Sequence, residues 1–233
     1  MELRSDMQAS LIKHAAEDGD VTCAARVSTL GGEARYETSD DGAGLINYLM
    51  RDRHGSPFEH TSFTFYVEAP IFVAREFMRH RAGWSYNEES GRYKELQPVF
   101  YVPDDHRKLV QVGKPGRYEF EDGTELQRTA LSRDLYSAYS WASEHYRSLL
   151  SRGIAREVAR IVLPVGLYTS FYATCNARSL MHFLSLRTKN SSAKVPSFPQ
   201  REIEMVAESM EEQFKKLMPV TYAAFNTHGR IAP

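Results

Sequence analysis

The feature that most constrains the fold is a long amphipathic segment, residues 126–150, whose apolar residues recur at helical spacing. Gly153 follows it and predicts where this helix ends. Shorter helical patterns are spread along the rest of the chain. They cover residues 24–27 behind an Asp20 cap, 45–53, 70–81 with Pro70 in the first turn, 155–163 up to Pro164, 177–187 and 201–217.

Strand patterns are fewer. Residues 61–68 alternate, with Phe63, Phe65 and Val67 on one side, which predicts a half-buried strand. Further strands are expected over 99–102 and 167–175, whereas residues 10–14 fit either a short strand or a frayed helix. Residues 82–93 are expected to form a loop, and 103–123 a surface excursion.

Long helices around a few separated strands predict an α+β fold, with an antiparallel or mixed sheet flanked by helices. The chain has neither an internal repeat nor a low-complexity linker, so residues 1–233 are expected to form a single domain. Within it, residues 103–123 are expected to be a variable surface insertion.

The composition is typical of a globular protein: 42% of the 233 residues are hydrophobic and 25% are charged. No run approaches the roughly 20 apolar residues of a membrane span, and the first residues contain no apolar signal core. Cys23 and Cys175 are too few for a disulfide framework. A cytoplasmic protein that does not associate with membranes is therefore expected.

Basic and acidic residues nearly balance, 29 against 30, which argues against a dedicated nucleic-acid binder. The common nucleotide and hydrolase motifs are also missing. Asn47 stands where a GxGxxG pattern needs its last Gly, and Pro115 follows Lys114 where a P-loop needs Ser or Thr. No metal site is predicted, because His54 and His60 are not at helical ligand spacing.

The most unusual stretch is Arg79-His80-Arg81, followed by a polar loop interrupted by Gly83 and Gly91. Cations near a helix C-terminus complement its dipole by about 0.3–1 kcal/mol, which accounts for one or two basic residues but not three in a row. On a helix, the three side chains would point in different directions and serve different partners. The loop adds hydroxyls and backbone N–H groups, so an anion or nucleotide site is expected here.

A second polar cluster surrounds residues 177–187, where Leu180, Met181, Phe183 and Leu184 predict a largely buried helix. Its polar members are Arg160, Asn176, Arg178, His182 and Arg187. Arginines that are buried without neighbouring acids usually bind an anionic partner.

Together these residues form a recognisable pattern. Arg79-His80-Arg81, eight residues and then Ser90 resemble the RHR-x(7,8)-S signature of the flavin-dependent thymidylate synthases. Other blocks of that family are matched in the same order, over about residues 9 to 225. They are Ser56-Pro57-Phe58-Glu59-His60, residues 70–81, Ala159-Arg160-Ile161-Val162-Leu163-Pro164 and Asn176-Ala177-Arg178-Ser179-Leu180.

The resemblance implies reductive methylation of dUMP to dTMP. The carbon would come from methylenetetrahydrofolate, the hydride from reduced FAD, and NADPH would reduce the flavin. It also implies a homotetramer whose active sites are shared between chains, which would explain why no dinucleotide-binding fold is needed.

The resemblance assigns site residues position by position. The implied FAD-binding residues are Ser56, Arg79, His80, Arg81, Glu88, Asn176, Ala177, Arg178 and His182. The implied dUMP-binding residues are Glu76, Phe77, Met78, Arg79, Glu88, Glu89, Ser90, Gly91, Arg92, Arg160 and Arg187. The roles of His54 and Trp84, and direct ligand contacts of Glu76 and Glu88, are left open.

Arg187 is the expected catalytic residue, because a guanidinium beside the uracil would stabilise negative charge as N3 ionises. Ser90 has no dedicated base in the motif, so it is assigned to substrate binding rather than to nucleophilic attack. Cys175 is interpreted as a small buried residue rather than a thiolate.

Two other classes remain open from the residues alone. One is an RNA- or nucleotide-binding module that stacks bases on Trp84, Tyr86 and Tyr93. The other is a flavin oxidoreductase that transfers no methyl group.

Overall fold

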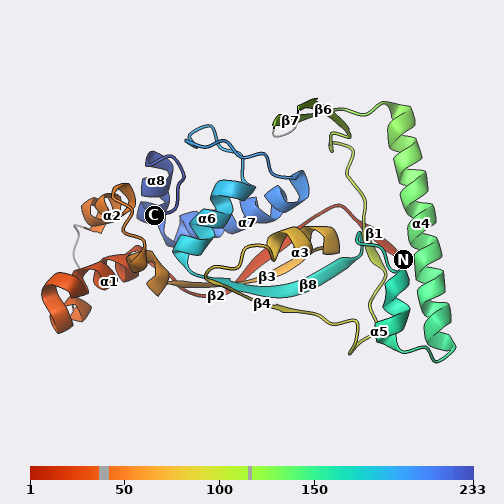
Figure 1. Ribbon diagram of the computed structural model, residues 1–233, viewed down its shortest axis with the longest axis horizontal. Helices are drawn as coiled ribbons and strands as arrows, with labels where there is room; N and C mark the ends of the chain where they lie inside the picture. The colour runs from red at the N-terminus through yellow and green to blue at the C-terminus, as the bar shows by residue number, and fades with distance from the viewer. Residues whose placement is uncertain (37–41, 115–116) are drawn as a thin grey trace. The chain divides into compact units, whose positions relative to one another are not determined.

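The computed structural model describes residues 1–36, 42–114 and 117–233 (Figure 1). These residues form two compact units. The first unit is Met1–Met7, Glu68–Glu76 and Glu88–Ser170; the second is Gln8–Val67, Phe77–Asn87 and Phe171–Pro233. The single domain and the insertion at 103–123 stay predictions, and residues 115 and 116 of that insertion lie outside the described residues.

A four-stranded sheet has the order β2-β3-β8-β4. Its strands are β2 (Gln8–Ala15), β3 (Ser62–Pro70), β4 (Trp84–Glu88) and β8 (Tyr168–Cys175), most of whose residues belong to the second unit. The alternation in β3 is confirmed, since Phe63, Phe65 and Val67 are all fully buried. Residues 10–14, which fitted a strand or a helix, lie in a strand.

The second unit also contains five α-helices and two short 3-10 helices among its described residues. They are α1 (Asp18–Leu30), η1 (Gly31–Tyr36), α2 (Gly42–Arg51), η2 (Ser56–His60), α6 (Ala177–Arg187), α7 (Arg201–Leu217) and α8 (Pro219–Thr227). Helix α7 packs against the sheet, with the Phe214 ring edge-on to Phe63 at 6.1 Å between centroids. The expected bounds of α6 and α7 are confirmed, whereas α8 was not expected.

The N-terminus of α8 is capped by a residue of α1. The carboxylate of Asp18 accepts hydrogen bonds from the backbone N–H groups of Val220 and Thr221, at 2.9 and 2.8 Å, and from the Thr221 hydroxyl at 2.6 Å. Asp20 is not the cap of α1, contrary to expectation. It lies in the first turn, and its carboxylate accepts from the N–H of Glu17, which is the N-cap residue.

The first unit contains the long helix, which runs from Glu125 to Ser151 (α4) and confirms the expectation for 126–150. The Tyr139 ring stacks on Phe100 at 4.5 Å, and its hydroxyl donates to the Tyr101 carbonyl at 2.9 Å. The remaining elements are β1 (Glu2–Arg4), α3 (Ile71–Phe77), β5 (Val99–Tyr101), β6 (Val110–Lys114), β7 (Arg117–Glu121), α5 (Arg156–Ala159) and η3 (Arg160–Val162). Strands β1 and β5 pair in parallel, and β6 and β7 are antiparallel.

The α+β class and the mixed pairing are confirmed, and the expected excursion 103–123 contains the β6–β7 hairpin. Three local expectations were wrong. Helix α3 ends at Phe77, so Arg79-His80-Arg81 lies in an irregular turn instead of on a helix. The expected loop 82–93 contains strand β4. The expected helix 155–163 is two short pieces, α5 and η3. Among the described residues, no helix combines the length and apolarity that crossing a membrane requires.

Replacing Asp18 with alanine should destabilise the second unit. The change removes the acceptor of three hydrogen bonds and exposes the α8 N-terminus, so we expect the free energy of unfolding to fall by about 2–3 kcal/mol. Urea denaturation followed by circular dichroism measures this. As a matched control, Glu208→Ala removes an exposed carboxylate paired with Arg201 and should cost less than about 1 kcal/mol. Equal losses would contradict the capping role.

Candidate functional site

The first pocket of the second unit is formed by the irregular turn after α3, the start of β4 and the end of α6. Its volume is about 540 Å³, and it is lined by Arg79, His80, Arg81, Ala82, Trp84, His182, Leu186 and Arg187. This lining contains three arginines and no carboxylate. Two sequence motifs about a hundred residues apart therefore build one cationic surface.

A hydrogen bond between Arg187 and His80 organises this pocket. Nε of Arg187 donates to Nε2 of His80 at 3.0 Å. A guanidinium can only donate, so Nε2 must be unprotonated and the neutral ring carries its hydrogen on Nδ1. Burial, reinforced by the charges of Arg187, His182 and Arg79, lowers the pKa of His80 to about 4. The imidazole is therefore neutral at physiological pH and serves as an acceptor.

Aromatic packing fixes the backbone that carries His80. The His80 ring packs against the ring of Phe183 on α6, with 4.8 Å between their centroids. The fully buried Phe77 packs against the same Phe183 ring, with 4.6 Å between the Phe77 and Phe183 centroids. The Tyr86 hydroxyl donates to the His80 carbonyl at 2.7 Å. Trp84 stacks on Tyr86 and packs edge-on against Phe77, so one side of the indole is part of the core while Trp84 also lines the pocket.

A second pocket of about 430 Å³ shares Ala82 and His182 with the first. Its other lining residues are Glu59, Gly83, Asn176, Arg178, Ser179, Ala232 and Pro233. The Asn176 side chain caps α6, with Oδ1 accepting from the Ser179 N–H at 2.9 Å. Gly83 has φ +69°, and a Cβ there would collide with the Ser179 hydroxyl, so only glycine fits at this point.

Arg178 has partners within the chain. Its side chain is 45% exposed, forms an ion pair with Glu59 and donates from Nε to the Pro233 carbonyl at 2.6 Å. The α6 face that was expected to be buried is buried, because Leu180, Met181, Phe183 and Leu184 are fully covered. The arginines near this helix are not fully buried, since Arg187 is half-buried and Arg178 and Arg160 are exposed.

The first unit has its own pocket, of about 290 Å³. It contains Glu88, Glu89, Gly91 and Arg160 of the expected substrate residues, together with Ile71, Leu96, Ile161, Leu163, Leu167, Tyr168 and Thr169. The backbone approaches the Arg160 side chain so closely at Gly91 that a Cβ there would press on Leu96 and Arg160.

The carboxylates in this pocket are held in fixed positions. Oε1 of Glu88 accepts from the Thr169 hydroxyl at 2.6 Å. Glu89 accepts from the Ser170 N–H at 3.1 Å and pairs with Lys94 at 2.8 Å. Arg92, which is exposed, pairs with Glu157 at 3.1 Å, and the Ser90 hydroxyl accepts from the Arg92 N–H at 3.3 Å.

Some expected site residues line none of these three pockets. They are Ser56, exposed at the start of η2; Glu76 and Met78, half-buried; Phe77 and Ala177, fully buried; and Ser90 and Arg92, beside the pocket of the first unit. Their ligand contacts stay predictions. Burial raises the pKa of the Cys175 thiol, which favours the unreactive form. The described residues contain no cluster of three or more His, Cys, Asp or Glu side chains suited to a metal ion.

Sequence reasoning missed several lining residues, chiefly Glu59, Tyr168 and Thr169. Tyr168 and Thr169 begin β8, where their aromatic and β-branched character indicated only a strand. The Tyr168 hydroxyl donates to the Asp6 carbonyl at 2.6 Å, and Arg4 lies over its ring at 4.7 Å. Residues so far apart in sequence give no local signal of this contact.

The low pKa of His80 should appear in the pH dependence of stability. The unfolded chain binds this proton below the ordinary pKa of 6.5, whereas the folded protein binds it only near pH 4. The free energy of unfolding should therefore fall as pH decreases from about 6.5 to 4, by at most about 1.4 kcal/mol per pH unit from this group. His80→Asn should have a shallower slope in urea titrations across this range, and equal slopes would refute the assignment.

The chain is similar over nearly its whole length to proteins of one family. Residues 10–220 match the family model described as thymidylate synthase complementing protein. A relative from Streptomyces avermitilis, named flavin-dependent thymidylate synthase, is 65% identical over 233 residues, covering 99% of this chain and 95% of the relative. A relative of the same name from Tropheryma whipplei is 55% identical, covering 98% of this chain and 96% of its own.

A solved structure extends the match to three dimensions. The UMP/dUMP methylase PolB from Streptomyces cacaoi, crystallised with 5-Br dUMP, is 56% identical, with a TM-score of 0.94 and complete coverage of both chains. The match to the family model covers the signature and the other polar blocks that form the pockets. The chain therefore belongs to the thymidylate synthase complementing protein family, the family of the flavin-dependent thymidylate synthases.

Proposed function

We propose that this chain is a flavin-dependent thymidylate synthase that methylates carbon 5 of the uracil of dUMP to give dTMP. Methylenetetrahydrofolate would donate the carbon, and NADPH would reduce the FAD. The observation that carries the proposal is the cationic pocket that joins Arg79-His80-Arg81 to Arg187 at the end of α6. It gathers the family's signature and the expected catalytic arginine on one surface.

The residues of the two pockets in the second unit fit FAD. Its pyrophosphate needs cations that donate hydrogen bonds, which Arg79, Arg81 and Arg178 offer. When bound, the flavin would supply the hydride of the reductive methylation. The chain's own contribution is to hold anionic groups and to keep His80 neutral.

Arg187 would act on the uracil ring. Its guanidinium stays protonated, so it can stabilise the negative charge that develops as N3 of the uracil loses its proton and C5 becomes a better nucleophile. The hydrogen bond from Nε to His80 holds the plane of the guanidinium. Because a neutral imidazole receives this bond, the partner adds no opposing charge to offset that of Arg187.

Arg160, Glu88 and Glu89 would contribute substrate contacts from the pocket of the first unit. Arg160 would bind an anionic group of the nucleotide, and the fixed carboxylate of Glu88 would accept from a hydroxyl or a ring N–H. A homotetramer is part of the proposal. In its support, large apolar side chains of the first unit are exposed, with Tyr136 and Trp141 each 58% and Ile161 78% accessible.

A specific observation favours a second candidate function, methylation of UMP as well as dUMP. The same Streptomyces cacaoi methylase was also crystallised with 5-Br UMP, and that structure is 55% identical to this chain, with a TM-score of 0.93. The two candidates differ only in whether the sugar's 2′-hydroxyl is tolerated.

The purified protein should be yellow and should form dTMP only when dUMP, methylenetetrahydrofolate and NADPH are all present. Flavin absorbance and mass spectrometry of the nucleotide product measure this, and omitting each component in turn provides the controls. Parallel reactions with UMP separate the candidates, since methylation of dUMP alone supports the first and comparable methylation of both supports the second. A colourless protein that binds no added FAD would contradict both.

Arg187→Ala should retain FAD and lose dTMP formation by about 10²–10³-fold in kcat, because the missing group acts on charge that develops during the reaction. Flavin content and steady-state kinetics measure the two effects. Arg133→Ala removes an exposed arginine paired with Asp134 and should leave kcat unchanged. Normal turnover by Arg187→Ala would refute its catalytic role.

A further inference from the structure

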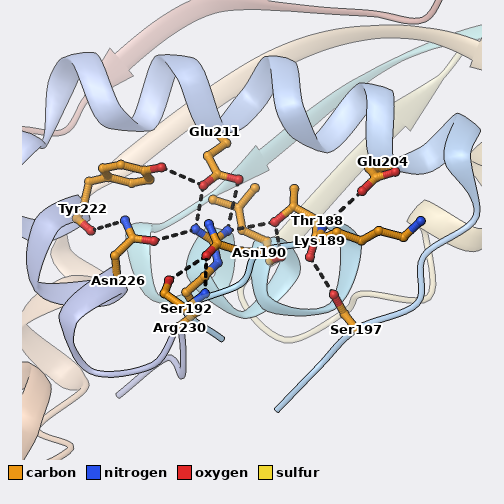
Figure 2. A network of polar contacts seen from close by, with 11 residues as sticks. Thr188, Lys189, Asn190, Ser192, Ser197, Glu204, Glu211, Tyr222, Asn226 and Arg230 are labelled. Atoms are coloured by element: carbon orange, nitrogen blue, oxygen red, sulfur yellow. Dashed lines mark hydrogen bonds and ion pairs between the residues drawn. The ribbon is translucent and has the colours of Figure 1, made fainter. Parts of the chain in front are cut away.

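A buried polar network includes Thr188, which directly follows Arg187 in the sequence (Figure 2). At its centre is Arg230, whose side chain is 1% exposed. Its two terminal nitrogens donate to both carboxylate oxygens of Glu211 on α7, at 2.7 and 3.0 Å. They also donate to Oδ1 of Asn226 and to the hydroxyl of Thr188, both at 2.8 Å.

Thr188 is the residue that follows Arg187, and the network fixes every polar group it has. Its hydroxyl accepts from Arg230 and donates to the Leu184 carbonyl at 2.8 Å, and its N–H donates to the same carbonyl at 3.0 Å. Its carbonyl accepts from the Ser197 hydroxyl at 2.6 Å. The next N–H, of Lys189, donates to Glu204 of α7 at 3.1 Å. The chain therefore leaves α6 along one defined path.

The composition of this network suits a positioning role better than a purely stabilising one. Removing an arginine and a glutamate from water is costly, and apolar side chains of similar volume often give equal or greater stability. Arg230 also has φ +56°, a conformation that residues other than glycine rarely adopt. A buried ion pair does provide a fixed orientation, because two parallel hydrogen bonds to a carboxylate allow only one orientation of the guanidinium.

We propose that the Arg230–Glu211 pair, acting through Thr188, is a positioning device for Arg187. The pair fixes the backbone at the end of α6 through the hydroxyl of Thr188. In the pocket, His80 Nε2 fixes the Arg187 side chain by accepting from its Nε at 3.0 Å. Arg187 is thus fixed at both its backbone and its Nε. The inference rests on the catalytic role proposed for Arg187; Arg230, Glu211 and Thr188 touch no reacting atom in this scheme.

Thr188→Val tests the proposal, because it keeps the branched shape and removes only the hydroxyl. We expect kcat for dTMP formation to fall about 10- to 100-fold, as for a catalytic group displaced by about 1 Å. FAD content should not change, and KM for dUMP should change far less than kcat. Thr188→Ser keeps the hydroxyl and should restore kcat.

Thr221→Val is the matched control. Thr221 is also buried and in the second unit, and its hydroxyl donates to a carboxylate, that of Asp18, without a link to Arg187. Both valine variants should have a lower Tm, but only Thr188→Val should lose kcat. Equal kcat losses in the two variants, or a folded Thr188→Val enzyme with normal kcat, would overturn the proposal.

A crystal structure of Thr188→Val without flavin gives a readout that is independent of turnover. We expect the hydrogen bond from Arg187 Nε to His80 Nε2 to be lost or shared with a second arginine rotamer, and an unchanged contact would overturn the proposal. If the wild-type protein forms no methylated nucleotide, the proposed function fails, yet this structure still decides whether the network positions Arg187.

Discussion

The guanidinium of Arg187 needs a hydrogen-bond acceptor, and the cationic pocket of the second unit provides one in His80. Nε of Arg187 donates to an imidazole that burial and neighbouring cations keep neutral. Phe183 packs against the His80 ring and Phe77 packs against Phe183, so the aromatic core of the unit contributes to the burial that lowers the pKa of His80. The packing around His80 therefore also determines its protonation state and, through the hydrogen bond, the orientation of Arg187.

The sequence predicted the elements whose patterns are long or regular. The bounds of α6 and α7 were found because capping, apolar periodicity and end signals all agree there, and α4 was found by its length. Helix α8 was missed because it is short and its N-terminus depends on Asp18, which no local pattern reveals. Strand β4 was hidden by Gly83 and Gly91, although Trp84, Ser85, Tyr86 and Asn87 alternate in exposure as a strand at the edge of a sheet does.

The candidate site was predictable at the level of motifs but not of contacts. The resemblance assigned Arg79 and Arg187 to one ligand and Arg79 and Arg81 to another, and all three line one pocket. Their surroundings were not predictable: Arg178 pairs with Glu59, 119 residues away, and Glu88 accepts from Thr169. The helical geometry assumed for Arg79-His80-Arg81 failed because the chain turns after Phe77, whose carbonyl accepts the His80 N–H. Contacts between distant segments decide the first result, and a local turn decides the second.

The cap of α8 has a consequence for how the chain reaches its fold. Asp18 and Val220 are separated by 202 positions, and two stretches of the first unit, Glu68–Glu76 and Glu88–Ser170, lie between them in sequence. On the ribosome, α1 is therefore complete long before its partner helix exists. Contacts of such high sequence separation slow folding, because the chain loses the entropy of closing a long loop before the contacts that stabilise it can form. The hydrogen bonds from Val220 and Thr221 to Asp18 can therefore form only after the last part of the chain has been synthesised.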